Sequence, residues 1–278
     1  MQTLEDFIRP TQKQLFQALR TRFRKCGVMF CAGNFILVRG TAPVMLVAHM
    51  DTVHKNPVEQ ICASPDGNIL MSPQGIGGDD RCGCYALVKI WDLSPKKPWL
   101  LFTCNEELGG LGADMFCKLY GAQRLPKGLD TLKFIVELDR KGSNDAVYYN
   151  CANADFEDYV SCCGFVTATG SFSDISFIAP DLGVAAVNLS CGYYNAHTLH
   201  EYINVAELEH TIVRVLGMVD DATQDDFPVC EYVEFDTHFD FQDNGLEHAA
   251  FVRYGLSGKH FCDEIDDHDY DAPLRHLK

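Results

Sequence analysis

Several features that mark other classes of protein are missing from this sequence of 278 residues. It has no run of eighteen or more apolar residues, so we expect no membrane-spanning helix. The residues from Met1 to Asp6 lack a basic stretch followed by an apolar core, so we expect no secretory signal. Basic residues number 23 against 39 acidic ones, a balance that argues against a nucleic-acid surface. These absences predict a cytoplasmic globular protein.

The cysteines have neither the number nor the spacing of a disulfide framework. There are 13, an odd number, and no C-x-x-C pair occurs. Cys82 and Cys84 flank one glycine, and Cys162 adjoins Cys163, but neither spacing suits a tetrahedral zinc site. We expect most of them to be small buried residues in a reducing cytosol.

The negative charge is concentrated near the end of the sequence. Between Asp221 and Lys278 there are 15 acidic and 4 basic residues, so most of the net charge of -16 lies there. We therefore predict one large domain over residues 1–220. Residues 221–278 are predicted to form an acidic extension that packs partly on this domain.

The stretch VMLVAHMDTV, from Val44 to Val53, is an apolar run that ends in His49 and Asp51. Such a run is typical of a fully buried strand. Alternation along the strand places His49 and Asp51 on the same side. On its own, the pattern fits the polar edge of a core better than it fits a metal site.

The same pattern recurs along the chain, and this recurrence favours a metal site over the polar edge of a core. Two further apolar runs, Pro98 to Cys104 and Leu132 to Leu138, are followed by acidic residues, and a third, Val184 to Leu189, leads to a histidine-containing loop. Ligands of open α/β sheets collect at the carboxyl ends of strands. The side chains that would meet there are Glu106, Glu107, Asp139 and His197, with Asp79 at the start of a helix after a glycine-rich segment. A solvated helix start for the Glu pair and a helix cap for Asp79 are the alternatives.

Imidazole and carboxylate ligands suit zinc, with cobalt or manganese as alternatives. Two histidines and three carboxylates exceed the three protein ligands of one catalytic zinc. The set fits two divalent metal ions that share a bridging carboxylate and a water.

Regular structure outside these runs is also predicted. Helices are expected over 11–25, 155–167 and 205–219, a strand pair over 28–39, and a strand at Tyr148 to Asn150.

Five segments, VMLVAHMDTV, GIGGDDRCG, TCNEELGGLGA, VELD and NAHTLHEY, resemble the metal motifs of the co-catalytic zinc exopeptidases. That clan includes peptidase T, the carboxypeptidase G type enzymes and the single-domain zinc aminopeptidases. The resemblance runs from Val44 to Val219, and the order of the motifs matches. It implies an α/β fold, a three-layer sandwich with a central mixed, mostly parallel sheet flanked by helices, and a catalytic role for the predicted domain.

The resemblance also implies a role for each metal ligand. His49 and Asp139 would hold one metal, and Glu107 and His197 the other. Asp79 would bridge both, and the peptide bond after it is expected to be cis.

Two further roles follow from the resemblance. Glu106 would be the general base, and Asp51 would hold the ring of His49. The last ligand of the family lies four residues before a glutamate, which selects His197 with Glu201. His200 would then lie behind the ligands or face the substrate, and an exchange of these two histidines stays open.

One departure from the family concerns access to the site. Two-domain members insert a lid between the third carboxylate and the last histidine, but Asp139 and His197 are only 58 residues apart. This spacing leaves no room for a second domain and indicates the compact aminopeptidase-like arrangement. Tyr193 or Tyr194 would polarise the scissile carbonyl or simply pack. Asp174 would receive a substrate amine or cap a turn.

The leading interpretation is a dinuclear metal-dependent hydrolase that acts on peptides as an aminopeptidase or other exopeptidase. The alternatives are an N-acyl amino acid or other small-amide hydrolase with the same metal site, and a non-catalytic metal-binding protein. Expected partners are a peptide or small-amide substrate, with no nucleic acid and no membrane. The oligomeric state is left open.

Overall fold

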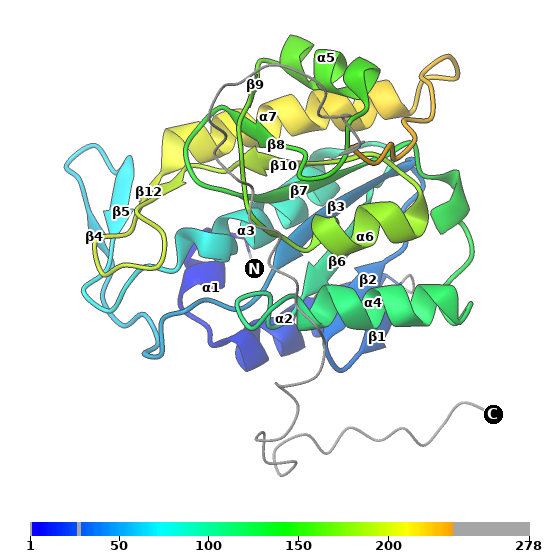
Figure 1. Ribbon diagram of the computed structural model, residues 1–278. Helices are drawn as coiled ribbons and strands as arrows, with labels where there is room; N and C mark the ends of the chain where they lie inside the picture. The colour runs from blue at the N-terminus through cyan, green and yellow to red at the C-terminus, as the bar shows by residue number, and fades with distance from the viewer. Residues whose placement is uncertain (1, 27–28, 236–278) are drawn as a thin grey trace, which may run out of the picture. The chain divides into compact units, whose positions relative to one another are not determined.

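The predicted apolar runs form the centre of an eight-stranded sheet in the computed structural model, which describes residues 2–26 and 29–235 (Figure 1). The strand order is β1-β2-β6-β3-β7-β10-β8-β9. The interior neighbours β6, β3, β7 and β10 run parallel, and antiparallel pairing begins on either side of them. The strands are β1 (Met29–Ala32), β2 (Phe35–Val38), β3 (Val44–His49), β6 (Trp99–Thr103), β7 (Phe134–Arg140), β8 (Asp145–Val147), β9 (Val166–Thr167) and β10 (Ala186–Ser190).

Helices cover both faces of this sheet, because residues along its strands are apolar on both sides. Leu46 of β3 packs in one core cluster, while its neighbours Met45 and Val47 pack in the other. The first cluster includes residues of α1 (Glu5–Ile8), α2 (Gln12–Arg24), α3 (Gly78–Leu93), α5 (Ala154–Cys162) and α7 (Val205–Ala222). The second includes α4 (Leu111–Gly121) and α6 (Ile175–Leu182), which lie together in front of the sheet in Figure 1. The three-layer α/β fold is therefore confirmed.

A small second sheet joins two loops that follow strands of the large one. Its order is β11-β12-β5-β4, and every pair is antiparallel. Because β5 follows β3 in the chain while β11 and β12 follow β10, the pairing ties these two connections together. The strands are β4 (Cys62–Ala63), β5 (Ile69–Met71), β11 (Tyr193–Tyr194) and β12 (Tyr202–Asn204).

Two predictions of regular structure were wrong in detail. The helix expected over 155–167 ends at Cys162, because Gly164 adopts a φ of 87° that a helix cannot continue. Val166 and Thr167 instead form the edge strand β9. The strand expected at Tyr148 to Asn150 lies three residues earlier as β8, and Tyr149 has a φ of 53° that is incompatible with a strand.

The segment after α7 returns to the edge of the domain. Cys230 donates its backbone N–H to Lys133 at 2.8 Å and accepts that of Ala185 at 2.8 Å. The compact unit extends to Phe235, so the predicted division at residue 220 falls inside α7. The rest of the predicted acidic extension lies outside the described residues. Within residues 2–26 and 29–235, no helix has both the length and the hydrophobicity needed to cross a bilayer.

Gly83 tests the close packing of α3 on the sheet. A Cβ at this position would lie 2.0 Å from the carbonyl oxygen of Leu138 and 2.5 Å from the carboxylate of Asp80. We expect Gly83→Ala to lower the free energy of unfolding by about 1–3 kcal/mol or more, because backbone and buried carboxylate would both have to move. Gly121, also helical, has nothing within 4 Å of an added Cβ, so Gly121→Ala should leave stability unchanged or raise it by up to about 1 kcal/mol. Urea denaturation compares the two, and equal stabilities would contradict the observed approach of α3.

Candidate metal centre

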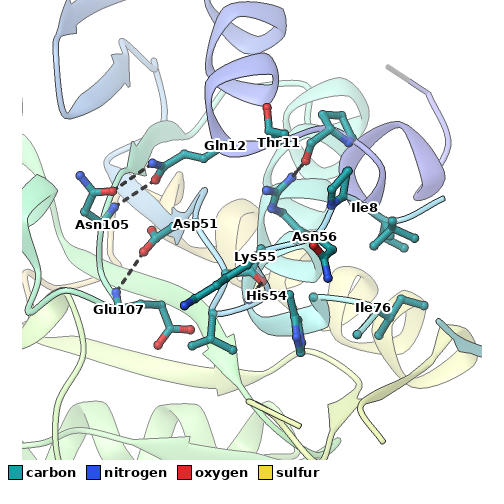
Figure 2. A pocket seen from close by; sticks show the side chains of 18 of the residues that line it. Ile8, Thr11, Gln12, Asp51, His54, Lys55, Asn56, Ile76, Asn105 and Glu107 are labelled. Carbon is teal, nitrogen blue, oxygen red and sulfur yellow. Dashed lines mark hydrogen bonds between the residues drawn. The ribbon is translucent and has the colours of Figure 1, made fainter. Parts of the chain in front are cut away.

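Three neighbouring strands, β6, β3 and β7, deliver the polar residues that follow them to one edge of the sheet. Just after β3, Asp51 accepts the backbone N–H groups of Glu106 and Glu107, both at 3.1 Å, and Figure 2 shows the bond from Glu107. Its Oδ1 lies 3.3 Å from Nδ1 of His49. Burial opposes ionisation of Asp51, but the His49 ring and the two amides outweigh it and lower its pKa. Asp51 thus holds the loop after β6 and lies against the ring of His49.

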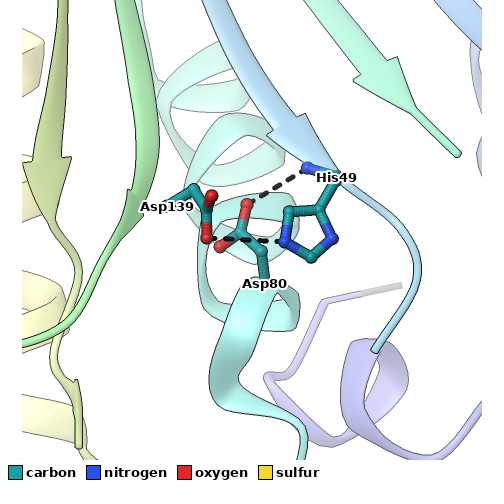
Figure 3. A group of neighbouring side chains, drawn as sticks. All are labelled: His49, Asp80 and Asp139. Carbon is teal, nitrogen blue, oxygen red and sulfur yellow. Dashed lines mark hydrogen bonds and ion pairs between the residues drawn. The ribbon is translucent and has the colours of Figure 1, made fainter. Parts of the chain in front are cut away.

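His49 ends β3 with its side chain 1% exposed. Its Nε2 lies 3.1 Å from Oδ1 of Asp79 and 3.4 Å from Oδ1 of Asp139. Figure 3 shows the imidazole facing Asp139, while Asp80 accepts the backbone N–H of His49 at 3.2 Å. Burial lowers the pKa of His49, but the carboxylates around it, Asp139 above all, outweigh burial and raise that pKa well above its usual range.

His197 lies on the loop between β11 and β12 and reaches the same carboxylates from the other side. Its Nε2 lies 3.1 Å from Oδ2 of Asp79 and 3.1 Å from Oε1 of Glu107. The two oxygens of Asp79 therefore face two different imidazoles. Burial opposes the charge of Asp79, but hydrogen bonds with His197 and His49 lower its pKa. The peptide bond between Asp79 and Asp80 is cis, as expected.

These distances fit divalent cations better than a set of hydrogen bonds. A ring nitrogen has one direction in which to bond, yet both Nε2 atoms have two carboxylate oxygens at 3.1–3.4 Å. Ligand atoms about 2.0 Å from a tetrahedral zinc lie about 3.3 Å from one another. Oε1 of Glu107 is buried and makes no hydrogen bond within the part of the chain that the structure describes. The donor atoms of His49, Asp79 and Glu107 lie within 4.8 Å of one another, as do those of His49, Asp80 and Asp139. The residues present therefore fit a metal site.

Glu106 lies beside this cluster. Its Oε2 is 4.0 Å from Nε2 of His49, farther than the carboxylates of Asp79 and Asp139. Burial raises the pKa of Glu106 to about 9, although the nearby His49 lowers it. Asp139 itself has a pKa raised to about 7 by burial, and it accepts a hydrogen bond from the hydroxyl of Tyr193 at 3.2 Å.

The three residues suggested for substrate binding have other surroundings. Asp174 is completely buried at the start of α6 and accepts a hydrogen bond from Thr103, and burial raises its pKa to about 6. The hydroxyl of Tyr194 donates to Glu207. The side chain of His200 makes no ion pair with the described residues. Of the two tyrosines considered, Tyr193 is the one that contacts the cluster.

Glu201 is a part of the site whose role sequence reasoning missed. Its side chain is 1% exposed and accepts the backbone N–H groups of Gly77 and Asp79, both at 2.9 Å. Its Oε2 also lies 2.8 Å from Nε2 of His54. The signal for this residue in the sequence is its position four residues after His197, which by itself distinguishes only between His197 and His200. Glu201 therefore fixes the backbone that leads into Asp79, the residue that faces both imidazoles.

Two other buried acids were also missed. Asp80 accepts the backbone N–H of Gly83 at 2.9 Å besides that of His49, and burial raises its pKa well above the usual range. Glu137 of β7 is fully buried and accepts a hydrogen bond from Ser173, and burial likewise raises its pKa. The Asp79-Asp80 pair and the motif VELD carried the signal for both.

Glu201→Gln should destabilise the protein even after removal of metal. The amide has one acceptor oxygen in place of two, so one buried backbone N–H loses its partner, at a cost of about 1–3 kcal/mol. Urea denaturation of the chelated protein measures this loss. Glu59→Gln makes the same chemical change on an exposed side chain and should change stability by less than about 0.5 kcal/mol. Equal effects of the two changes would rule out the described role of Glu201.

No family model and no curated protein matches the sequence. Solved structures, however, share its fold. Aminopeptidase PepT from Bacillus cereus has a TM-score of 0.57 at 16% identity, over 80% of this chain and 97% of that one. A tripeptidase from Staphylococcus aureus has a TM-score of 0.59 at 13% identity, over 79% and 96%. A Zn-dependent exopeptidase from Parabacteroides distasonis has a TM-score of 0.53 at 13% identity, over 78% and 94%. At these identities the likeness establishes the fold, which is the one that the resemblance implied.

Proposed function

We propose that this protein is a dinuclear metal-dependent hydrolase that releases residues from the N-terminus of peptides. The observation that carries the proposal is the position of Asp79, whose two oxygens each lie 3.1 Å from the ring nitrogen of a different histidine. A carboxylate placed in this way suits a bridge between two cations. Support for peptides as substrates comes from the solved structures that share the fold, which include a tripeptidase and an aminopeptidase.

The proposed ligands divide into two sets. His49 and Asp139 would hold one cation, His197 and Glu107 the other, and Asp79 both. Two such cations, when bound, supply a Lewis acid for the scissile carbonyl and lower the pKa of a nearby water. Asp51 would keep the ring of His49 in place, as carboxylates behind ligating histidines do.

Glu106 is the proposed general base. It lies next to the ligand cluster, and its buried carboxyl has a pKa raised to about 9. Positive charge held by the neighbouring ligands would favour the ionised form, which can accept a proton from the attacking water. Glu106 would then return that proton to the leaving amine.

A reducing compartment is proposed for the protein. All twelve cysteines of the part of the chain that the structure describes are free. Free thiols persist in the cytosol and are oxidised outside it.

Glu106 and Glu107 are adjacent but should respond differently to the same substitution. Glu106→Gln keeps the shape and the ligands but removes the proton acceptor. We expect turnover to fall by roughly 10²–10⁴-fold, with near-normal metal content and no rescue by added zinc. Glu107→Gln should lose metal, and excess zinc should restore part of its activity. Elemental analysis beside a peptide-turnover assay measures both.

Asp114→Asn supplies a control for these substitutions, because its side chain pairs with Lys118 on the outer face of α4. It should retain both metal and turnover. Near-normal turnover of Glu106→Gln would exclude Glu106 as the base. Loss of metal from both glutamate variants would show that the division between base and ligand is wrong. Cleavage of N-acyl amino acids with no release of residues from peptides would favour the small-amide alternative.

Removal of metal should also destabilise the fold. Asp79, Glu107 and Asp139 would repel one another without cations, and a ligand that binds only the native state stabilises it by about 4 kcal/mol at a thousand times its Kd. We expect the melting temperature to fall by several degrees after exhaustive chelation and to return with zinc. Calorimetry measures this fall in melting temperature, and chelation should lower the melting temperature of His197→Ala by less. Equal melting temperatures with and without metal would refute the expectation.

A further inference from the structure

A pocket of about 460 Å³ adjoins the candidate metal centre (Figure 2). Its walls come from the segment around the start of α2, the loop after β3 and the loop after β6. Asp51 and Glu107 belong to both the pocket and the metal centre. The volume is typical of clefts that bind small ligands. A substrate whose reacting bond lies at the metal centre would therefore place its neighbouring groups in this pocket.

The charged side chains that line the pocket differ in whether they already have a partner. Its two carboxylates are engaged, because Asp51 accepts two backbone amides and Glu107 lies against His197. Cations at the metal centre would offset both. Arg81 is 2% exposed and donates to the backbone carbonyls of Phe7 and Pro10, and it has no carboxylate partner among the described residues. The remaining charge of the pocket is therefore positive.

Lys55 is the lysine that lines this pocket, and within the described residues it makes no ion pair or hydrogen bond. Figure 2 shows its side chain extending across the pocket in the direction of Glu107. The loop that carries it is anchored, because the neighbouring His54 contacts Glu201 at 2.8 Å and donates its backbone N–H to Thr52 at 3.0 Å. The backbone next to Lys55 is thus anchored beside the metal centre, and its exposed side chain extends from there.

The start of α2 adds to the positive potential. Thr11 and Gln12 line the pocket, and the amino end of a helix favours negative charge. The side-chain amide of Gln12 is already used, because it donates to Oδ1 of Asn105 at 3.0 Å and accepts the backbone N–H of Asn105 at 3.1 Å. Lys55 is therefore the side chain in the described pocket best able to pair with an anionic ligand.

We propose that this pocket binds a carboxylate of the substrate through the ammonium group of Lys55. The inference deepens the proposed function and rests on it, since it names substrates that carry a negative charge near the scissile bond. That charge has two sources of the same chemistry, an acidic side chain or the free carboxyl terminus of a short peptide. Ammonium and carboxylate pair through charge-assisted hydrogen bonds in either case.

Binding is measured by calorimetry on the zinc-loaded protein with ketomethylene dipeptide isosteres, which are not cleaved. One pair of probes has Glu or Gln as its first residue and a C-terminal amide. The other pair has two leucines and ends in a free carboxylate or in an amide. We expect at least one carboxylate probe to bind about tenfold more tightly than its neutral partner. The pair that shows the preference identifies the source of the charge.

Variants assign this preference to Lys55. Lys55→Ala should bring the ratio of the two Kd values close to one, and Lys55→Arg should retain most of it. Lys127→Ala removes the same charge from an exposed lysine outside the pocket and should keep the wild-type ratio. Equal binding of both members of each pair, absence of binding by every probe, or a preference that survives in Lys55→Ala would overturn the inference.

Turnover assays separate this inference from the proposed function. If a carboxylate preference depends on Lys55 but no peptide is cleaved, the pocket is assigned correctly and the peptidase proposal fails. If peptides are cleaved with no preference for a carboxylate, the function stands and the role of Lys55 is refuted.

Discussion

The constraint on which this structure depends is the gathering of several carboxylates at one edge of the sheet. Asp79, Glu107 and Asp139 all lie within 3.4 Å of an imidazole nitrogen, and Glu106 is only slightly farther away. Charges this close and this buried need compensation from a cation or a proton. The raised pKa values of Glu106 and Asp139 favour compensation by a proton. Asp79 instead faces two imidazoles, and its pKa is lowered. Divalent cations would provide the same compensation.

The acids around this cluster hold the backbone that carries it. Glu201 accepts the amides of Gly77 and Asp79, Asp51 those of Glu106 and Glu107, and Asp80 that of His49. The segments of three proposed ligands, His49, Asp79 and Glu107, are therefore each fixed by a carboxylate from another part of the chain. Such bonds give the site its geometry, because a ligand set is only as well ordered as the groups behind it.

Access to the centre is shaped by the segment around the start of α2 and by the loop after β3. The pocket lies between them, and Glu201 links that loop through His54 to the backbone of Asp79. The loop that carries Lys55 and the backbone of Asp79 are thus linked through the side chain of Glu201. A shift of the loop after β3 would also displace Asp79, so recognition of the substrate and positioning of its reacting bond are coupled.

Local patterns in the sequence were enough for the buried strands and for the residues that converge at their ends, while the resemblance of the motifs implied the fold class. A continuous apolar run ending in His49 predicts a buried strand, and parallel strands must bring their ends to one edge. The partners of Glu201 and Asp80 and the pocket that Lys55 lines could not be predicted in this way, since each depends on segments far apart in the chain. The end of α5 and the displaced strand β8 were decided by left-handed backbone at Gly164 and Tyr149, which residue patterns indicate poorly. Sequence thus determined which groups meet, while long-range packing decided which of them face a cation, which hold a backbone amide and which remain free to bind a ligand.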